Sequence, residues 1–346
     1  MTSFFNKLQR GLKVCFAALC MLLTASPATV HAYDFTINGI SYDVLSYDEL
    51  RCEVADVFTK ADGAIKIPDT VEFDGRTFRI TSIGGYAFDG CRSITSIQLP
   101  DGITSIGSCA FRDCSSLTSL QLPEGVTSIG NETFYGCSSL TSLQLPNSVT
   151  SIGSGAFDGC SSLTSLKLPD GVKSIGESAF LSCSSLTSLQ IPDGVTSIGD
   201  YAFGGCWRLK ELVLPKSLES LGRYIFEQSI DDYSYVKLSK LVCSSMSPPR
   251  IDSWYTFPRN YNFFSDVVLY VPKGSLEAYR EADRWKNFDS IVEYDLEDGI
   301  DEVVAPGAER KEVGRYDLSG REVDGSHKGI TIVRYDDGSA TKIYQD

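Results

Sequence analysis

A repeat of 23 residues constrains the fold of this chain more than any other feature of its sequence. Seven phenylalanines recur at this interval: Phe88, Phe111, Phe134, Phe157, Phe180, Phe203 and Phe226. Leucines or isoleucines, a proline, a glycine and a cysteine recur at the same interval around them. A fixed period of this length predicts a solenoid, in which one coil buries its apolar residues only by stacking on its neighbours.

A single repeat unit predicts the course of one coil. Residues 117–122 read Leu-Thr-Ser-Leu-Gln-Leu, an alternation that predicts a β-strand. Pro123 lacks an N–H group and ends the pairing, and Gly130 is expected to let the chain turn. The stretch from Phe134 to Cys137 is expected to form a helical turn. We therefore predict a leucine-rich-repeat, right-handed superhelix of mostly short parallel β-strands with single helical turns.

The first 32 residues have the pattern of a secretory signal peptide. Basic residues precede the apolar run Val14–Leu23, which is too short to cross a bilayer as a helix, and small residues precede a cleavage point after Ala32. We expect an exported protein, at the cell surface or secreted, with an uncleaved anchor as the alternative. The segment holds three basic residues and no acidic ones, so the rest is more negative than the −14 of the whole sequence. That charge disfavours nucleic acid as a partner.

Turn and cap signals divide the chain into five predicted segments. They are a signal peptide (1–32), an N-terminal β-hairpin cap (33–61), a solenoid with a helical end cap (62–294), a linker (295–315) and a small β-rich C-terminal tail (316–346). The hairpin is predicted because Asn38-Gly39 separates two alternating runs. Ser275 is expected to cap the terminal helix.

Cysteines form a row within the repeat. Nine of the eleven cysteines follow the signal peptide, and six share one repeat position: Cys91, Cys114, Cys137, Cys160, Cys183 and Cys206. Cysteines in adjacent coils could lie within disulfide distance. We favour buried, reduced thiols that fill the turn, because the number is odd and free cysteine is among the most buried residue types. A local bridge between Cys109 and Cys114 is the main alternative.

Catalytic chemistry is not indicated by the sequence. Its two histidines, His31 and His327, lie in the signal peptide and the tail, so the solenoid has no histidine general base, and it carries no metalloprotease or phosphate-loop motif. We expect no enzyme, cofactor or metal site; a carboxylate-dependent hydrolase is the alternative. An acidic row follows the prolines, and we expect it to be solvated turns rather than calcium ligands. Its members are Asp101, Glu124, Asp170 and Asp193.

Two rows of polar residues are predicted to face solvent from the inner, concave sheet. The candidate ligand-binding residues on it are Ser119, Gln121, Ser142, Gln144, Lys167 and Gln190. They could form a broad binding platform, or simply a soluble face on which amides stack. A more varied row on the outer turns is the alternative site. Its residues are Arg112, Tyr135, Asp158 and Leu181.

The repeat unit resembles a known family. The pattern L-x-x-L-x-L-P-x-x-V-x-x-I-G-x-x-x-F-x-x-C is similar to the BspA-like (Treponema-type) leucine-rich repeats of bacterial surface proteins, and the resemblance covers roughly residues 33–294. Leu269-Tyr-Val-Pro and the residues after it resemble the usual end of that family. Residues 316–346 resemble the C-terminal sorting tail of type IX secretion cargo in Bacteroidetes.

The resemblance implies a function in binding. It implies a cell-surface adhesin that recognises host matrix proteins or other cells, and a tail that engages the secretion machinery. A surface carbohydrate-binding component is the alternative, which exposed aromatics such as Tyr135 or Tyr201 would favour if they line one face. We expect an extracellular protein or glycan ligand and no membrane-spanning segment after the signal peptide.

Overall fold

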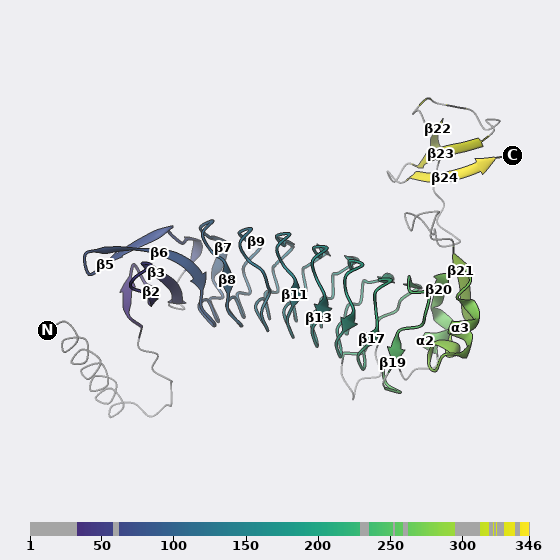
Figure 1. The fold of residues 1–346 in the computed structure, drawn as a ribbon, viewed down its shortest axis with the longest axis horizontal. Coiled ribbons are helices and arrows are strands. Elements are labelled where there is room, and N and C mark those ends of the chain that lie inside the picture. Colours follow the sequence, from purple (N-terminus) through teal and green to yellow (C-terminus); the bar gives the residue numbers. More distant parts are fainter. Residues whose placement is uncertain are drawn as a thin grey trace.

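A computed structural model describes residues 33–57, 62–228, 235–251, 253–258, 262–294, 312–317, 321, 323, 329–335 and 340–345. Most of these residues form coils stacked side by side along one axis, with a different arrangement at each end (Figure 1). The predicted signal peptide, residues 1–32, lies outside the described residues. So does the predicted linker up to residue 311, and the strand β22 begins at Glu312, within the segment expected to be linker.

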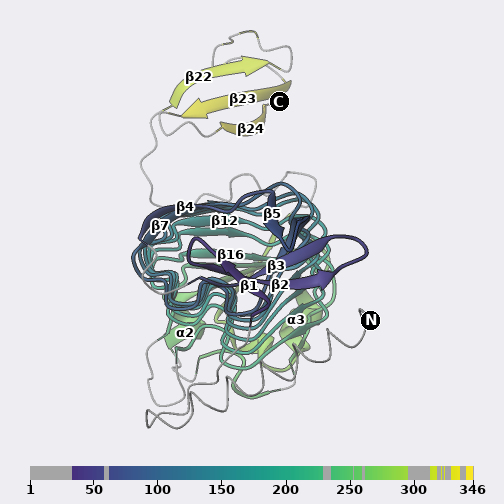
Figure 2. The same cartoon turned by 90° about the vertical axis from the view of Figure 1, so that its left-hand side faces the viewer.

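Each regular coil contributes to two parallel ladders of strands on different sides of the stack, which Figure 2 shows along its axis. The first ladder contains β4 (Gly63–Lys66), β7 (Ile94–Gln98), β9 (Ser119–Gln121), β10 (Ser142–Gln144), β12 (Ser165–Lys167), β14 (Ser188–Gln190), β16 (Glu211–Leu214), β18 (Lys240–Cys243), β20 (Val268–Pro272) and β21 (Ser290–Tyr294). The second contains β8 (Ser105–Ile106), β11 (Ser151–Ile152), β13 (Ser174–Ile175), β15 (Ser197–Ile198), β17 (Ser220–Leu221) and β19 (Arg250–Ile251). The predicted leucine-rich-repeat solenoid is confirmed.

The turn that carries the repeat phenylalanine forms a third line of contacts between coils. The amide of Phe134 donates to Ala156 O at 2.9 Å, and the amide of Phe157 donates to Ala179 O at 2.8 Å. Every such turn except that of Phe226 holds two left-handed residues, such as Glu132 (φ 53°) and Gly136 (φ 69°), which a regular helical turn does not contain. Equivalent positions are therefore hydrogen-bonded from coil to coil on this side as well.

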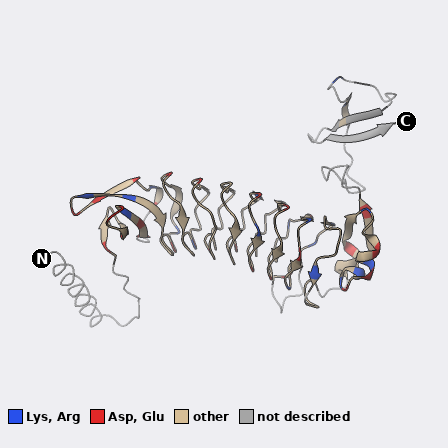
Figure 3. Ribbon diagram, in the orientation of Figure 1, with Lys and Arg blue, Asp and Glu red and all other residues tan. Residues whose placement is uncertain are grey.

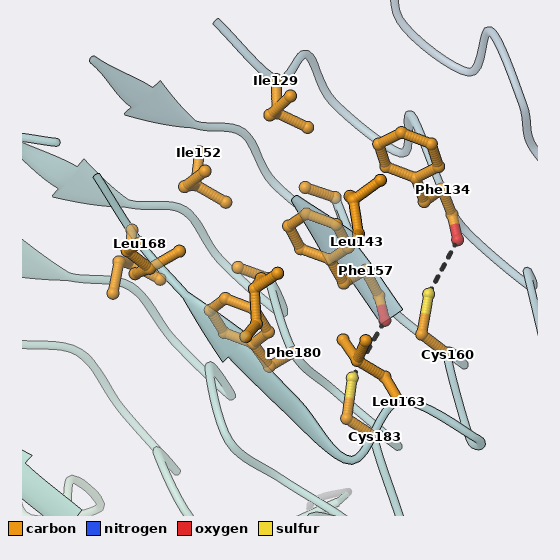
Figure 4. Packing of buried hydrophobic residues seen from close by; sticks show 14 of the residues in the cluster. Ile129, Phe134, Leu143, Ile152, Phe157, Cys160, Leu163, Leu168, Phe180 and Cys183 are labelled. Carbon is orange, nitrogen blue, oxygen red and sulfur yellow. Dashed lines mark hydrogen bonds between the residues drawn. The ribbon is translucent and has the colours of Figure 1, made fainter. Parts of the chain in front are cut away.

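The core is a stack of aromatic rings along the solenoid axis. Phe157 lies between Phe134 and Phe180, with centroids 5.5 and 5.4 Å away and ring planes within 8° of parallel. All seven repeat phenylalanines are fully buried. Figure 4 shows the rings of Phe134, Phe157 and Phe180 packed against leucines and isoleucines of both ladders. Each ring therefore fills the space between two coils.

The cysteine row has a polar role that the sequence did not reveal. Cys160 Sγ donates to Phe134 O at 3.2 Å, and Cys183 Sγ donates to Phe157 O at 3.2 Å (Figure 4). Equivalent bonds join the other row members to the preceding coil. Burial raises the pKa of the Cys206 thiol to about 12. The thiols are therefore neutral donors at ordinary pH.

Within the described residues, all nine cysteines are buried and free. The alternative of a bridge between Cys109 and Cys114 is therefore not what the structure shows. Cys109 Sγ instead lies 3.8 Å from the Glu132 carboxylate of the next coil. Burial raises the pKa of this thiol too, although a hydrogen bond with Tyr86 opposes the shift.

The glycine that follows each isoleucine is required for a different reason than the one predicted. Neither Gly130 nor Gly176 has a left-handed backbone, so turning the chain does not explain them. A Cβ atom added at Gly176 would lie 2.6 Å from backbone atoms of Gly153 in the preceding coil. At Gly130 the nearest atom would be the Thr133 hydroxyl, at 3.3 Å. Close approach of neighbouring backbones therefore selects glycine at most of these positions.

The N-terminal cap is larger than the predicted hairpin. Asn38 and Gly39 turn the chain with positive φ values of 52° and 80°. A second hairpin turns at Asp74 and Gly75 and lies within the segment predicted to be solenoid. The strands of this cap are β1 (Phe35–Ile37), β2 (Ile40–Ser46), β3 (Arg51–Val57), β5 (Thr70–Phe73) and β6 (Arg76–Ile83), and β6 pairs with β8. The cap sheet thus continues into the second ladder.

The C-terminal cap comprises α2 (Asn262–Asp266), α3 (Leu276–Glu281) and the short 3-10 helix η1 (Trp285–Asn287). The prediction that Ser275 caps the helix was wrong, because its hydroxyl donates to Pro272 O at 2.6 Å. Glu293 of β21 takes that role: its Oε1 accepts from the amides of Gly274, at 2.7 Å, and Leu276, at 3.4 Å. A carboxylate at a helix N-terminus stabilises the helix through its dipole.

The tail holds an antiparallel sheet of β22 (Glu312–Asp317), β23 (Gly329–Tyr335) and β24 (Ala340–Gln345). No helix among the described residues is long and apolar enough to cross a membrane.

Candidate functional site

The six residues predicted to bind a ligand share one side of the first ladder. Ser119 and Gln121 lie on β9, and the other four occupy β10, β12 and β14; all six are exposed. The strands pair in register, so that Gln144 lies opposite Gln121 and Lys167 lies opposite Gln190. We call this surface the Ser/Gln face, and define it by Ser119, Gln121, Ser142, Gln144, Lys167 and Gln190.

A line of threonines runs beside the Ser/Gln face. The hydroxyl of Thr141 donates to Thr118 O at 3.2 Å, and Thr118 donates in turn to Thr95 O at the same distance. Lys167 is the one charged member of the face, and most of the ribbon of the central coils is uncharged (Figure 3). The surface can therefore offer hydrogen bonds from amides and hydroxyls and a single ammonium group, that of Lys167.

The first ladder changes character toward its C-terminal end. Lys240 replaces the serine of earlier coils, and its ammonium lies 3.4 Å from Glu211 and 5.4 Å from the centroid of the Tyr270 ring. The Lys240 side chain is only 8% exposed. Sequence reasoning missed Lys240 and Tyr270 as candidates because the interval between coils rises above 23 residues there.

The alternative outer row lies on the turn side of successive coils. The Arg112 guanidinium is 5.6 Å from the centroid of the Tyr135 ring, and its Nη1 is 3.6 Å from Glu132. Burial, with a smaller contribution from Glu132, raises the pKa of Asp158 to about 6. Leu181 packs beside the backbone of Gly204. The row is thus a varied surface whose residues have partners in neighbouring coils.

Aromatic residues gather on the same turn side in the last coils. The Tyr201 and Tyr224 rings stack at 5.0 Å, and the Tyr224 and Tyr255 rings stack at 5.3 Å. Trp254, next to Tyr255, is 74% exposed. Of the two tyrosines singled out from the sequence, Tyr201 belongs to this stack, whereas Tyr135 lies under Arg112. Trp254 and Tyr255 were missed because they lie beyond the regular spacing.

Acidic side chains do not converge on a metal site in the described part of the chain, where no cluster of three or more histidine, cysteine or acidic ligands occurs. The four residues of the acidic row, Asp101, Glu124, Asp170 and Asp193, are exposed. Asp193 pairs with Lys216 of the next coil at 2.8 Å. Both side chains of this ion pair are exposed to solvent, as expected for residues on a solvated turn.

Known proteins share this repeat. Residues 77–184 and 110–233 match the BspA type leucine-rich-repeat region, with six copies. The chain belongs to this family. Proteins of the BspA-type repeat family are generally non-enzymatic binding proteins, and leucine-rich repeats bind protein partners. The resemblance of the tail to a type IX sorting domain stays a prediction.

Solved structures include similar proteins. A leucine-rich-repeat protein from Bacteroides ovatus is 25% identical, over 76% of this chain and 77% of its own, with a TM-score of 0.52. A leucine-rich cell surface protein from Faecalibacterium prausnitzii is 25% identical, over 77% of this chain and 74% of its own, with a TM-score of 0.57. The T. pallidum leucine-rich-repeat protein is 31% identical, over 54% of this chain and 84% of its own, with a TM-score of 0.47. No curated protein matches the chain.

Proposed function

We propose that this BspA-type repeat protein is an exported adhesin that recognises host matrix proteins or other cells through its Ser/Gln face. The observation that carries the proposal is the register of that face. Hydrogen-bonding side chains repeat at the same position in β9, β10, β12 and β14, and all point to solvent. A rigid polar array of this kind suits an extended protein partner.

Energetics favour many weak contacts over one tight site. The Ser/Gln face has no aromatic residue, and tight protein interfaces concentrate their affinity on buried tryptophan, tyrosine and arginine. Backbone hydrogen bonds and ring stacking already hold the coils, so the backbone loses little conformational entropy when the partner binds. Repeated equal contacts suit a partner that is itself repetitive, where several modest interactions add up.

Export and surface attachment rest on separate support. The first 32 residues have the charge and apolar pattern of a signal peptide, and a similar protein from F. prausnitzii is described as a cell surface protein. The three-stranded tail would then be the sorting signal that engages the secretion machinery. A chain ending at Tyr294 is expected to keep its melting temperature and to lose surface display. Unchanged display on intact cells would reject this role.

Substitution of three glutamines tests the adhesin. We expect Gln121, Gln144 and Gln190, changed together to alanine, to weaken binding to matrix proteins or to partner cells in a titration. Each change removes an exposed amide and should lower the unfolding free energy by less than about 0.5 kcal/mol. The matched control changes Thr104, Thr127 and Thr150, exposed residues beside the second ladder, to alanine.

Two outcomes would contradict the Ser/Gln face. Full binding by the triple glutamine variant would move the site to the outer row, where Arg112, Tyr135, Asp158 and Leu181 become the residues to change. Equal loss in the threonine control would show that the effect does not depend on which face is altered.

A further inference from the structure

Trp254 is the most exposed large apolar side chain among the described residues, at 74%. Tryptophan carries the largest aromatic surface of any residue and gains most from burial, so such exposure indicates a binding role more strongly than an exposed leucine would. It precedes Tyr255 in the last coils, on the turn side of the solenoid and not on the Ser/Gln face.

The ring of Trp254 is held from one side. The Arg284 guanidinium lies 5.3 Å from its centroid and 5.7 Å from that of the buried Phe264, so the arginine connects the exposed indole to the C-terminal cap. Arg284 has a φ of 69°, a conformation that costs energy for any residue except glycine. The guanidinium at this position presents a cation to one side of the indole.

Three stacked tyrosines continue the surface beside Trp254. Tyr201, Tyr224 and Tyr255 have centroids 5.0 and 5.3 Å apart and planes within 15° of parallel. Tyr224 is buried, Tyr201 is half-buried and Tyr255 is 44% exposed. Because each ring restrains the next, this edge is rigid before any ligand arrives, which lowers the entropy lost on binding.

Polar groups of fixed orientation flank the rings. The Asp200 carboxylate accepts the Arg223 amide at 2.7 Å and Arg223 Nε at 2.8 Å, and it is 20% exposed. Arg223 is 59% exposed, so N–H groups of its guanidinium also face solvent. The pair therefore presents oriented acceptors and donors beside an apolar surface.

We propose that this edge, formed by Tyr201, Trp254 and Tyr255 with Asp200 and Arg223, binds carbohydrate, with the indole of Trp254 stacked on a pyranose ring. A pyranose has a flat C–H surface that packs on an aromatic face, and a rim of hydroxyls that bonds to carboxylate and guanidinium groups. A dry protein interface would instead need an apolar surround that excludes water from the anchor. Here Asp200 and Arg223 flank the tyrosines, which fits a small ligand with one apolar face and a polar rim.

Titration with neutral oligosaccharides tests the site. The probes are cellohexaose, xylohexaose, chitohexaose and maltohexaose, and the readouts are calorimetry and tryptophan fluorescence of the full chain. We expect saturable binding of at least one hexaose, with a blue shift of emission as the indole leaves water. Trp254→Ala should weaken that binding by about tenfold or more. Trp207→Ala is the matched control, because Trp207 is also exposed, at 39%, but lies outside the tyrosine stack.

The outcomes separate this site from the Ser/Gln face. Hexaose binding should survive the triple glutamine substitution, and matrix-protein binding should survive Trp254→Ala. The proposal is overturned if none of the four hexaoses binds, or if Trp254→Ala binds as tightly as the unaltered chain. It is equally overturned if Trp254→Ala abolishes binding of a protein partner, since the edge would then be a protein anchor.

Discussion

The central coils and the two ends of this solenoid are built differently. Between residues 103 and 198 nearly the same side chains recur, and the core rings lie parallel, as in the 5° between Phe157 and Phe180. At the C-terminal end many ring pairs meet edge-on, as in the 77° between Phe257 and Trp285, and others are stacked, as in the 21° between Phe257 and Phe263. Charged residues are frequent at both ends (Figure 3). In the central coils, recurring side chains stabilise the stacking of coils and produce a uniform surface. The more varied ends supply aromatic and charged groups that can distinguish ligands.

Alkaline pH should lower the stability of the central coils most, because a buried thiol recurs in each of them. Burial raises the pKa of Cys137 to about 12 and holds those of Cys160 and Cys183 well above the ordinary value. A raised pKa stabilises the fold below the unfolded pKa, and that stability is lost as pH rises toward the folded pKa. Each thiol should therefore lower the unfolding free energy by about 1.4 kcal/mol per pH unit above pH about 9, and the six of the row by about 8 kcal/mol per unit.

Denaturant melts at successive pH values measure this slope. The triple variant Cys137→Ala, Cys160→Ala, Cys183→Ala should lose roughly half of the row's contribution, about 4 kcal/mol per pH unit. Lysines and tyrosines titrate equally in both proteins, so they cancel in the comparison. If the unfolding free energy fell equally steeply with pH in the variant and in the unaltered chain, the buried thiols would not be the cause of the pH dependence.

Removing one core ring should have the next largest effect and should depend on position. Phe157→Ala opens a cavity between two regular coils and should cost about 3–5 kcal/mol. Because stability in a solenoid passes through neighbouring interfaces, the two halves should then unfold separately. Phe226→Ala, beside the irregular coils, should mainly fray that end. Hydrogen exchange resolved along the chain distinguishes separate unfolding of two halves from fraying of one end. The same pattern of protection in both variants would show that the position of the lost ring does not matter.

Adding one methyl group to the glycine column should have the smallest effect of the three. Gly176→Ala would place a Cβ atom 2.6 Å from the preceding backbone, and overpacking of this kind costs about 1–3 kcal/mol. Gly130→Ala is the matched control: its nearest contact would be 3.3 Å, to a side-chain hydroxyl. Thermal melts of the two variants test whether backbone contact between coils is uniform. A larger loss for Gly130→Ala would contradict the structure.

Periodicity made the fold predictable. Residues equivalent to Phe134 and Leu120 recur every 23 residues, and this recurrence was enough to predict the strands, the core and the stacking of coils. It was enough because the surroundings of a residue in one coil repeat in the next. The role of Cys160 as a donor depends on a carbonyl of another coil, which no local pattern contains. The close approach at Gly176 likewise depends on the distance between coils.

The ends were less predictable because their spacing is irregular. Asp74-Gly75 is a hairpin signal that could have indicated the larger N-terminal cap. The capping of α3 by Glu293 required a partner from a separate strand, so Ser275 was the natural but wrong candidate. The Ser/Gln face followed from strand alternation. The pairing of Trp254 with Arg284 joins a coil to a cap, and sequence spacing does not encode that contact.

Coil-to-coil contacts also bear on how the number of coils in this solenoid can change. Both strand ladders and the turn hydrogen bonds join equivalent positions, so a coil meets the same neighbour wherever it stands in the central array. The stretch Ser-Leu-Thr-Ser-Leu-Gln-Leu-Pro occurs at both 116–123 and 139–146. A coil added to or removed from this array would therefore meet the same kind of neighbour on both sides, and both caps would stay unchanged. The length of the Ser/Gln face can therefore change in steps of one coil without a change in the rest of the fold.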